Sequence, residues 1–485
     1  MSITCNSKKA RVGIMICGHK EYWPQFPGAK EAIMDGAKKF EKMVSDNNVD
    51  VVVTGMVDTV EASYKAGMIF KKNDIDLLFV YLHTYVASGR WVPGIVNLNV
   101  PVVLVALSKK FDFDSKTIEI AHVIKDGSPC QLPEAYSALL RTGKEPADVL
   151  FGGFENDSRI RKTISEWCSV AKILRTYKGC VIGYLGHSYD GMLDMNSDPT
   201  AFTGAFGVYI KMLEMCELVD YVNNTTDEEV DDKIREMEEI FDFVDASYDP
   251  TTKDIVQEDI VWAAKCAVGL DKLVSSHNLS GLAYYYEGLA NTYERVASNL
   301  IIGNTLLTRK GISLAGEADL KTCLAMKTTS AIGAGGSFCE LCIVDFDKDL
   351  VFIGHDGPHD IRISNARPVI RGLGLYHGKK GYGISVEYSI RHGDITMVSL
   401  ATDANNKFKF VVAEGQSVEG NVPEIGNTLT RGYFGKNVSK FIEDWTKAGP
   451  PHHASLCVGH VGSVIQKLGK ALKVDVEIVR SGGVD

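Results

Sequence analysis

The chain lacks both an excess of positive charge and an apolar run long enough to span a membrane. Its 485 residues carry 62 acidic and 52 basic side chains, for a formal net charge of -10. General nucleic-acid binding takes most of its affinity from a basic face, so this class is excluded. The longest apolar runs, 77–82 and 102–107, have the length of strands. We therefore expect neither a transmembrane segment nor a membrane partner.

The sequence also lacks a secretory leader and a cysteine framework. No apolar segment follows the few polar residues at the N-terminus. The eleven cysteines are an odd number scattered along the chain, which is not typical of a disulfide scaffold. We find no internal repeat or low-complexity segment either. These absences predict a globular cytoplasmic protein, large enough for two or three domains.

The first half of the chain alternates between strand and helix patterns. Apolar runs at 12–17, 51–54 and 75–82 surround an amphipathic stretch at 28–44, as in a parallel sheet. A second start follows at 180–185, an apolar strand before Gly186, with a predicted helix over 201–218. Thr226 and Glu229 form a capping-box pattern before an acidic helix, whose charges we interpret as a solvated face.

From about residue 326 the pattern changes to short apolar or alternating runs separated by Gly, Asp and Asn, at 350–353, 384–388, 396–400 and 408–412. Such runs are typical of β-structure. The predicted fold class is therefore α/β, with two Rossmann-like parallel-sheet domains, 1–178 and 179–325, followed by a β-rich, barrel-like domain, 326–485.

Three candidate metal ligands lie between residues 316 and 360: Glu317, Glu340 and His355. Glu340 interrupts the apolar run 338–344, which we expect to be a buried strand, and a carboxylate there needs a charged partner or a metal. Singly, Glu340 could pair with a basic residue, Glu317 could lie at a helix N-terminus, and His355 could be a loop histidine. Together, carboxylates and imidazole suit a cation such as Mn²⁺.

A second source of imidazoles is the sequence Pro-Pro-His-His at 450–453. The prolines make the backbone rigid, so one histidine could bind a metal while its neighbour orients it. The alternative is an ordinary surface pair, because histidines at the surface are common and metal ligands are comparatively rare.

Two other patterns are interpreted as structural. Cys339 and Cys342 form a lone Cys-x-x-Cys, but residues three apart on a strand point to opposite faces and no second pair completes a tetrahedral site, so we expect core cysteines. The glycine-rich run 333–336 lacks the Lys-Ser/Thr of a P-loop and the spacing of a dinucleotide fingerprint. A turn before a strand is the simpler interpretation.

In the N-terminal domain, His19 follows the first strand and His83 follows the strand at 75–82. Ligands of open α/β sheets gather at the carboxyl ends of parallel strands, so both histidines are candidate ligand contacts as well as candidate structural residues. The region 186–194 has the same kind of position in the second domain.

With these motifs in place, the sequence resembles the L-arabinose isomerase family, within the wider group of L-arabinose and L-fucose isomerases, over nearly the whole chain. The family's Gly-Glu-Gly-Asp-Trp-Lys-Thr corresponds to 316–322 and its Ser-Phe-Met-Glu to 337–340. Its two histidine motifs correspond to His355 and to the pair His452 and His453, and its Leu-His-Thr and following Trp to His83 and Trp91.

The resemblance implies that the metal is bound by Glu317, Glu340, His355 and His453. It also implies three domains and a homo-oligomer, commonly a hexamer. Some positions depart from the family: its Asn-Gln-x-x-His-Gly corresponds to 130–134, which keeps Gln131 but has no histidine, its Gln after the first strand is His19, and its Met-Leu-Glu is 356–358, Asp-Gly-Pro. The predicted sugar contacts are His19, His83, Trp91, Gln131 and His452.

These features predict a metal-dependent aldose–ketose isomerase that converts L-arabinose to L-ribulose, or a related aldose, through an enediol. Glu317 and Glu340 are the predicted proton-transfer groups. Mn²⁺ is the expected ion, with Co²⁺ and Mg²⁺ also compatible. Because the departures fall on expected sugar contacts, L-fucose, D-galactose and sulfoquinovose are alternative substrates. An alternative of another class is a non-catalytic sugar-binding protein, against which the missing leader and the metal motifs count.

Overall fold

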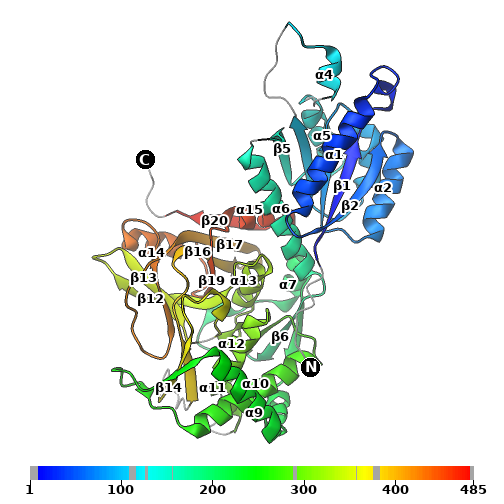
Figure 1. The fold of residues 1–485 in the computed structure, drawn as a ribbon. Helices are drawn as coiled ribbons and strands as arrows, with labels where there is room; N and C mark the ends of the chain where they lie inside the picture. The colour runs from blue at the N-terminus through cyan, green and yellow to red at the C-terminus, as the bar shows by residue number, and fades with distance from the viewer. Residues whose placement is uncertain are drawn as a thin grey trace. The chain divides into compact units, whose positions relative to one another are not determined.

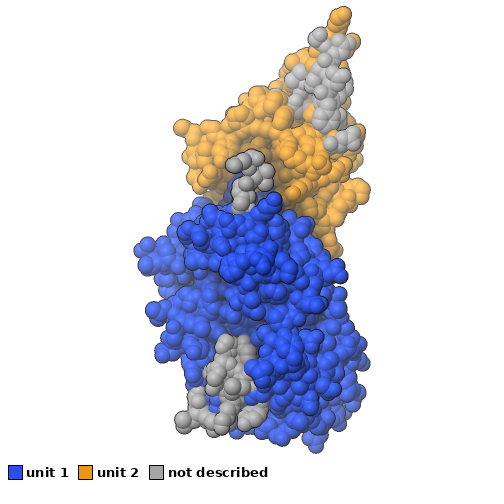
Figure 2. Space-filling model, turned by 90° about the vertical axis from the view of Figure 1, so that its left-hand side faces the viewer, with its two compact units in different colours: residues 1–6, 177–485 blue, residues 7–176 orange. Residues whose placement is uncertain are grey.

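The structure is a computed structural model that describes residues 9–108, 116–125, 129–155, 157–287, 292–356, 358–374 and 383–480. The chain divides into two compact units (Figures 1 and 2). The N-terminal unit is Ser7–Thr176, and the C-terminal unit is Met1–Asn6 with Tyr177–Asp485. Each unit is described by itself. The predicted ranges 179–325 and 326–485 both lie in the C-terminal unit, and the division into three domains remains a proposal.

The N-terminal unit contains a five-stranded sheet in the order β2-β1-β3-β4-β5, and all neighbouring strands are parallel. β1 and β3 are almost completely buried, as expected for central strands covered by helices on both faces. The predicted parallel α/β arrangement is confirmed. The strands are β1 (Arg11–Cys17), β2 (Asp50–Val57), β3 (Leu77–Leu82), β4 (Val102–Ser108) and β5 (Asp148–Gly153).

Helices connect these strands (Figure 1). The predicted amphipathic helix is α1, and its buried face carries Phe40, which stacks on Tyr81 of β3 with the ring centroids 5.5 Å apart. The helices are α1 (Ala29–Ser45), α2 (Val60–Lys72), α3 (Val92–Ile95), α4 (Ile120–Lys125), α5 (Gln131–Arg141) and α6 (Ser158–Tyr177).

The C-terminal unit begins with a second parallel sheet, in the order β11-β10-β6-β7. The predicted strand at 180–185 is β6 (Val181–Gly186), and the other strands are β7 (Tyr209–Leu213), β10 (Gly281–Tyr285) and β11 (Ser313–Ala315). The predicted continuous helix over 201–218 is wrong. Gly207 ends α7 (Pro199–Phe206) in the left-handed conformation, at φ 69°, and the chain forms the edge strand β7 before α8 (Met215–Asn223).

Helices surround this second sheet. The predicted capping box is confirmed: the Thr226 side chain accepts from the Glu229 amide and the Glu229 side chain accepts from the Thr226 amide. Most charges of this helix are exposed, but Lys233 is buried and binds Glu236 and Asp271. The helices are α9 (Asp227–Ile240), α10 (Gln257–Ser276), α11 (Thr292–Ser298), α12 (Ile301–Arg309) and α13 (Leu320–Ala331).

The predicted β-rich region is a mixed sheet that closes into a ring. Its order is β16-β19-β12-β13-β18-β17, and β16 also pairs with β17, which has β20 on its other side. The ring strands are β12 (Ser337–Asp345), β13 (Leu350–His355), β16 (Gly393–Thr402), β17 (Phe408–Ser417), β18 (Thr428–Tyr433) and β19 (Ala454–Val458), followed outside the ring by β20 (Asp475–Val479). Two helices accompany them, α14 (Val438–Lys447) and α15 (Gly462–Leu472). A smaller sheet joins β8 (Asp242–Val244), β9 (Thr252–Lys253), β14 (Val369–Leu373) and β15 (Gly383–Glu387).

The expectation that 338–344 is a fully buried strand is only half right. The first residues of β12 pair with β19 and are buried, whereas the second half pairs only with β13 in the described ranges. Cys342 and Ile343 are therefore exposed, and of the pair Cys339 and Cys342 only Cys339 lies in the core. The error arose because apolar residues do not reveal where a strand loses its second neighbour.

None of the helices in the described ranges is long and apolar enough to cross a lipid bilayer. Seven of the ten cysteines within those ranges are buried. Burial raises the pKa of Cys168 to about 12, because a thiolate is poorly solvated there, as expected of an unreactive core thiol.

Candidate metal centre

Glu317 lies in a strained turn directly after β11. This turn is the short 3-10 segment Gly316–Ala318, in which Glu317 has φ 55° and ψ 17° and Ala318 has φ 59°. Left-handed backbone at a non-glycine residue costs roughly 1–3 kcal/mol, and such strain clusters at functional sites. The turn thus places a carboxylate at the carboxyl end of a parallel strand, where α/β sheets bind ligands.

The two buried histidines come from the ring sheet. His355 is the last residue of β13, and His453 directly precedes β19. Both rings pack against Phe338 of β12, with centroid distances of 4.7 Å for His355 and 4.3 Å for His453. Phe338 is itself fully buried, so it forms a fixed support that limits how either imidazole can turn.

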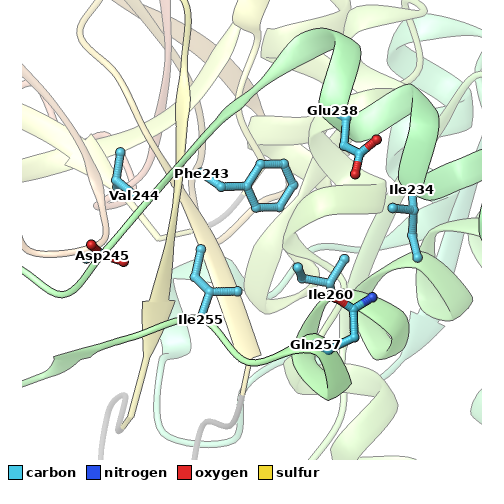
Figure 3. Close-up of a pocket in the computed structure, with 8 residues that line it drawn as sticks. All are labelled: Ile234, Glu238, Phe243, Val244, Asp245, Ile255, Gln257 and Ile260. Carbon is cyan, nitrogen blue, oxygen red and sulfur yellow. The ribbon is translucent and has the colours of Figure 1, made fainter.

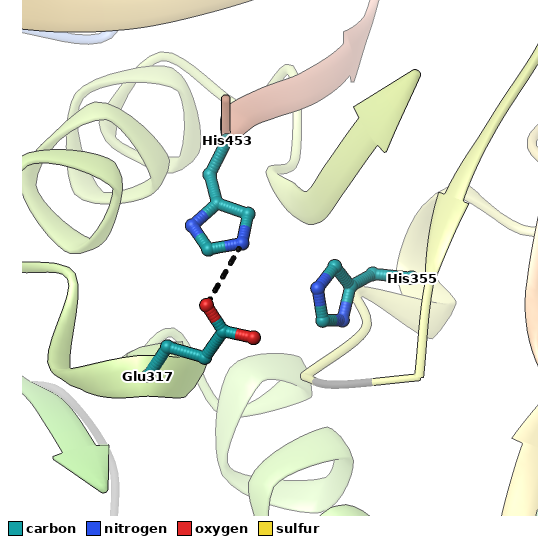
Figure 4. Close-up of side chains that lie close together, drawn as sticks. All are labelled: Glu317, His355 and His453. Carbon is teal, nitrogen blue, oxygen red and sulfur yellow. Dashed lines mark ion pairs between the residues drawn. The ribbon is translucent and has the colours of Figure 1, made fainter. Parts of the chain in front are cut away.

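Glu317, His355 and His453 converge, with one ligand atom from each lying within 4.8 Å of the other two (Figure 4). Glu317 Oε2 is 3.6 Å from His453 Nε2. Both of these atoms are buried, and neither has a hydrogen-bond partner among the described residues. Because buried polar atoms normally have partners, the unsatisfied pair fits a site that binds a cation.

A second group of donors shares His453. Ligand atoms of Glu340, His452 and His453 also lie within 4.8 Å of one another. Glu340 is half-buried, and it forms no ion pair with Lys or Arg in the described part of the chain. The alternative that Glu340 merely neutralises a basic residue therefore has no support. The two groups together contain all four predicted metal ligands.

His453 is oriented by Asp319, which sequence reasoning did not single out. Asp319 Oδ2 accepts from His453 Nδ1 at 3.1 Å, and its carboxylate also caps α13 by accepting from the amides of Lys321 and Thr322. Burial alone would raise the pKa of Asp319, but the hydrogen bond from His453 and the charge of Lys321 outweigh it and lower this pKa to about 2. A carboxylate that fixes the far nitrogen of a histidine is the usual support of a metal ligand.

His452 is held from the other side by Asp194. The Asp194 carboxylate accepts from the His452 amide at 3.1 Å and lies 2.7 Å from its Nδ1. His452 Nε2 is 3.7 Å from Glu317 Oε2. Burial alone would lower the pKa of His452, but its contacts with Glu317 and Asp194 raise it to about 9. Lys321 donates to the Asp194 carbonyl at 2.7 Å, which ties this loop to α13.

The protonation states of the other donors suit metal binding in different degrees. Burial lowers the pKa of His453, so its Nε2 lone pair is free at neutral pH. Burial alone would raise the pKa of Glu317, but the neighbouring histidines lower it and keep it a carboxylate. Burial alone would lower the pKa of His355, but Asp356, 2.5 Å from its Nδ1, and the two glutamates raise it. A cation bound to His355 would compete with a proton for this imidazole.

In the N-terminal unit, His19 and His83 lie where predicted: His83 directly follows β3, and Gly18 separates His19 from the end of β1. His19 is half-buried, with Nε2 3.4 Å from the Glu21 carboxylate and its ring 4.5 Å from that of Tyr22. His83 is fully buried and stacks on Tyr81, with the ring centroids 5.6 Å apart and the planes 4° from parallel. Of these two histidines, only His19 is open to a solute in this unit.

The other two predicted contacts of this unit are inside it. Trp91 is fully buried and belongs to the hydrophobic core between the sheet and α2, α3 and α5. Gln131, at the start of α5, is also buried, and its amide donates to the Leu82 carbonyl at the end of β3. Both residues thus have structural contacts, and their role toward a sugar remains a proposal.

A cavity of about 250 Å³ lies elsewhere in the C-terminal unit, between α9, β8 and the start of α10 (Figure 3). It is lined by apolar and polar side chains in similar measure: Ile234, Phe243, Val244, Ile255 and Ile260 together with Glu238, Asp245 and Gln257. None of the predicted site residues lines it. The candidate metal ligands and this cavity are therefore separate features.

Sequence reasoning missed the residues that support the ligands: Asp194, Asp319, Lys321 and Asp356. The Asp-Leu-Lys-Thr sequence at 319–322 has the pattern of a helix N-cap, which would have explained Asp319 without its contact to His453. The region 186–194 was noted only for its position after a strand. Contacts over more than 100 residues of sequence leave no local pattern.

Comparison with known proteins shows a likeness to L-arabinose isomerases. Residues 196–335 match the family model described as the L-arabinose isomerase central domain. The L-arabinose isomerase of Oceanobacillus iheyensis is 19% identical over 417 residues, 84% of this chain and 85% of that protein. That of Leuconostoc mesenteroides is 21% identical over 448 residues, 88% and 90% of the two chains, and that of Bacillus subtilis 20% over 409 residues, 83% and 80%.

Two parallel sheets, a closed β-rich sheet and a partly buried cluster of glutamates and histidines, taken with these relatives, support a sugar isomerase. The matched range 196–335 includes Glu317 and Asp319, and the relatives extend the likeness over most of the chain. The chain thus matches the central domain of L-arabinose isomerase over 196–335 and is similar to L-arabinose isomerases over most of its length.

Proposed function

We propose that the protein is a metal-dependent aldose–ketose isomerase that acts on a free sugar, with L-arabinose to L-ribulose as the first candidate reaction. One observation carries the proposal: Glu317, His355 and His453 bring their ligand atoms within 4.8 Å, and two of these atoms are buried without partners among the described residues. The L-arabinose isomerases that match the chain supply the candidate reaction.

In this proposal Glu317, Glu340, His355 and His453 hold one divalent cation, for which Mn²⁺ is our choice ahead of Co²⁺ and Mg²⁺. When bound, the cation supplies Lewis-acid stabilisation of the negative charge that develops on the sugar oxygens O1 and O2. Asp319 keeps His453 Nε2 turned toward Glu317, because its carboxylate occupies His453 Nδ1.

The proton transfer falls to a glutamate of the cluster. A carboxylate removes the proton from C2 of the open-chain aldose to give an enediolate and returns it to C1, while the hydroxyl proton moves from O2 to O1, which yields the ketose. Glu317 and Glu340 are both candidates, since each belongs to one of the two donor groups. Glu317 is only 20% exposed, and desolvation strengthens the interactions that position it. His452, held by Asp194, contacts Glu317 and is placed to orient a sugar hydroxyl.

The identity of the sugar depends on the side chains that contact it. We propose sugar contacts from His19, His83, Trp91, Gln131 and His452. His19, and the absence of a histidine at 130–134, distinguish this chain from the family pattern, and they motivate L-fucose, D-galactose and sulfoquinovose as further candidates. We also propose a homo-oligomer, with a hexamer as the first expectation from the family.

Metal-stripped protein incubated with L-arabinose, L-fucose, D-galactose and sulfoquinovose, with and without Mn²⁺, tests the function. Ketose formation that requires the metal, from any of these sugars, supports the reaction class and names the substrate. Tight sugar binding without ketose in folded, metal-loaded protein would instead support a non-catalytic sugar-binding protein. A matched control is His453→Gln, which removes one ligand from both donor groups.

A further inference from the structure

A second cluster of ionisable side chains lies at the outer edge of the parallel sheet of the C-terminal unit. Lys211 is on the edge strand β7, His277 directly follows α10, and Glu217 is in the first turn of α8. Lys211 Nζ is 2.6 Å from His277 Nδ1, and His277 Nε2 is 2.6 Å from Glu217 Oε1. The imidazole is 17% exposed and the carboxylate 34%, so the cluster is partly shielded but reachable from solvent.

The two contacts of His277 determine where its proton lies. A carboxylate can only accept, so Nε2 carries the hydrogen and donates to Glu217. Nδ1 of a neutral ring is then an acceptor, and the Lys211 ammonium donates to it. In the described ranges Lys211 has no carboxylate within ion-pair distance, whereas Lys253 and Lys409 have one at 2.6 and 2.7 Å. The nearest base to the Lys211 ammonium is therefore an imidazole.

Lys211, His277 and Glu217 thus follow the order of nucleophile, imidazole and carboxylate. Enzymes use this order of groups to activate nucleophiles. An amine attacks a carbonyl only after it loses its proton. His277 can accept that proton because Glu217 stabilises the resulting imidazolium. A lysine paired with a carboxylate is stabilised as the ammonium ion instead, and it reacts more slowly.

We propose that Lys211 is a modification site for small aldehydes, including the open-chain form of an aldose. His277 takes a proton from the Lys211 ammonium, and the amine adds to the aldehyde carbon to give a carbinolamine. His277 returns the proton to the carbinolamine oxygen, water leaves, and an imine remains. Amine and aldehyde thus give imine and water, with no oxidant or reductant. The reaction does not depend on the proposed isomerase activity.

The full-length protein, treated with limiting glycolaldehyde and with cyanoborohydride to reduce the imine, tests the proposal. Peptide mass spectrometry then measures the labelling rate of each lysine. We expect Lys211 to label at least about tenfold faster than Lys409, the internal reference, because general base catalysis contributes on the order of 100-fold or more. Equal rates for these two lysines would overturn the proposal.

Three variants separate activation from mere packing. His277→Gln is expected to slow labelling of Lys211 at least about fivefold while Lys409 is unchanged, and Glu217→Gln, which keeps the side-chain size, is expected to slow it less. His460→Gln, an exposed imidazole elsewhere, should change neither rate. If His277→Gln unfolds, Lys409 labelling rises as well, and Glu217→Gln then decides. Unchanged Lys211 labelling in a folded variant means that the cluster only ties β7 to α8 and α10.

Discussion

Polar side chains follow parallel strands in both units, but only one unit brings their donor atoms together. In the N-terminal unit, His83 stacks on Tyr81 and Gln131 binds the backbone of Leu82, so both have partners inside the unit. In the C-terminal unit, Glu317 and His453 turn buried, unpartnered atoms toward each other. Position at a strand end is therefore a weak indicator of function, and convergence of unsatisfied donors is a stronger one.

The two units also differ in the side chains that hold their candidate site residues in position. The rings of His355 and His453 rest on Phe338, and Asp319 and Asp194 hold His453 and His452 by their Nδ1 atoms. In the N-terminal unit, Trp91 is itself part of the core. A carboxylate that fixes an imidazole costs burial of charge, which a protein tolerates where the imidazole has a task.

The largest effect is expected for Trp91→Ala in the N-terminal unit. Removing a fully buried indole should lower the free energy of unfolding by about 3–5 kcal/mol, because a cavity remains in the core. Chemical denaturation measures this value. Tyr64→Ala, which truncates a side chain that is 55% exposed, is the control and should change stability by less than about 0.5 kcal/mol. A Trp91→Ala protein with unchanged stability and weakened sugar binding would mean that the indole contacts the sugar.

Next in size are Glu317→Gln and Glu340→Gln. Each should lower turnover at least about 100-fold, because each removes a candidate base and a metal ligand. Steady-state kinetics at saturating metal and circular dichroism on the same samples separate loss of chemistry from loss of fold. Glu477→Gln, which breaks the surface pair with Lys409, should leave turnover unchanged. Near-wild-type turnover in either glutamate variant removes that residue from the mechanism.

A smaller effect is expected for Asp319→Asn. The amide can still cap α13, but it no longer favours the imidazole orientation that exposes His453 Nε2, so metal affinity should fall by about 10–100-fold. A calorimetric titration of metal-stripped protein with Mn²⁺ gives the dissociation constant. A matched control is Asp360→Asn, because Asp360 caps the turn Ile361–Ile363 in the same unit. An affinity equal to that of the wild type would make Asp319 a helix cap only.

The smallest effect is expected for His19→Ala. This side chain is the more exposed of the two N-terminal histidines and contacts Glu21 and Tyr22, so its removal should not affect metal affinity. If it contacts the sugar, KM should rise by about 10-fold, the value of one hydrogen bond to a neutral group. If KM is unchanged for every sugar that the protein converts, His19 does not contact the sugar. The two units would then differ in function as well as in geometry.

The sequence predicted most elements of the fold because their local patterns are strong. β1 and β6 are continuous apolar runs, and the capping box at Thr226 and Glu229 forms as written. The helix expected over 201–218 failed because the mainly apolar residues of the edge strand β7 also suit a helix, and Gly207 was given too little weight. Burial of β12 failed because the sequence does not reveal where its second neighbour ends.

The donor groups could be proposed from sequence because their residue types are unusual in their surroundings and their motifs are specific. Glu340 stands in an apolar run, and His452 and His453 follow two prolines. The supporting residues could not, since Asp319 meets His453 across 134 positions and Asp194 meets His452 across 258. Such contacts depend on how the second parallel sheet packs against the ring sheet.

The most direct test of the account is the position of a bound ion. Crystals of the metal-stripped protein grown with Mn²⁺, with diffraction measured at an energy where manganese scatters anomalously, locate that ion without assumptions about mechanism. We predict one strong anomalous peak within bonding distance, about 2.0–2.4 Å, of donor atoms of Glu317, Glu340, His355 and His453. A peak elsewhere, or none at millimolar Mn²⁺, would contradict the assignment of this cluster as the metal centre.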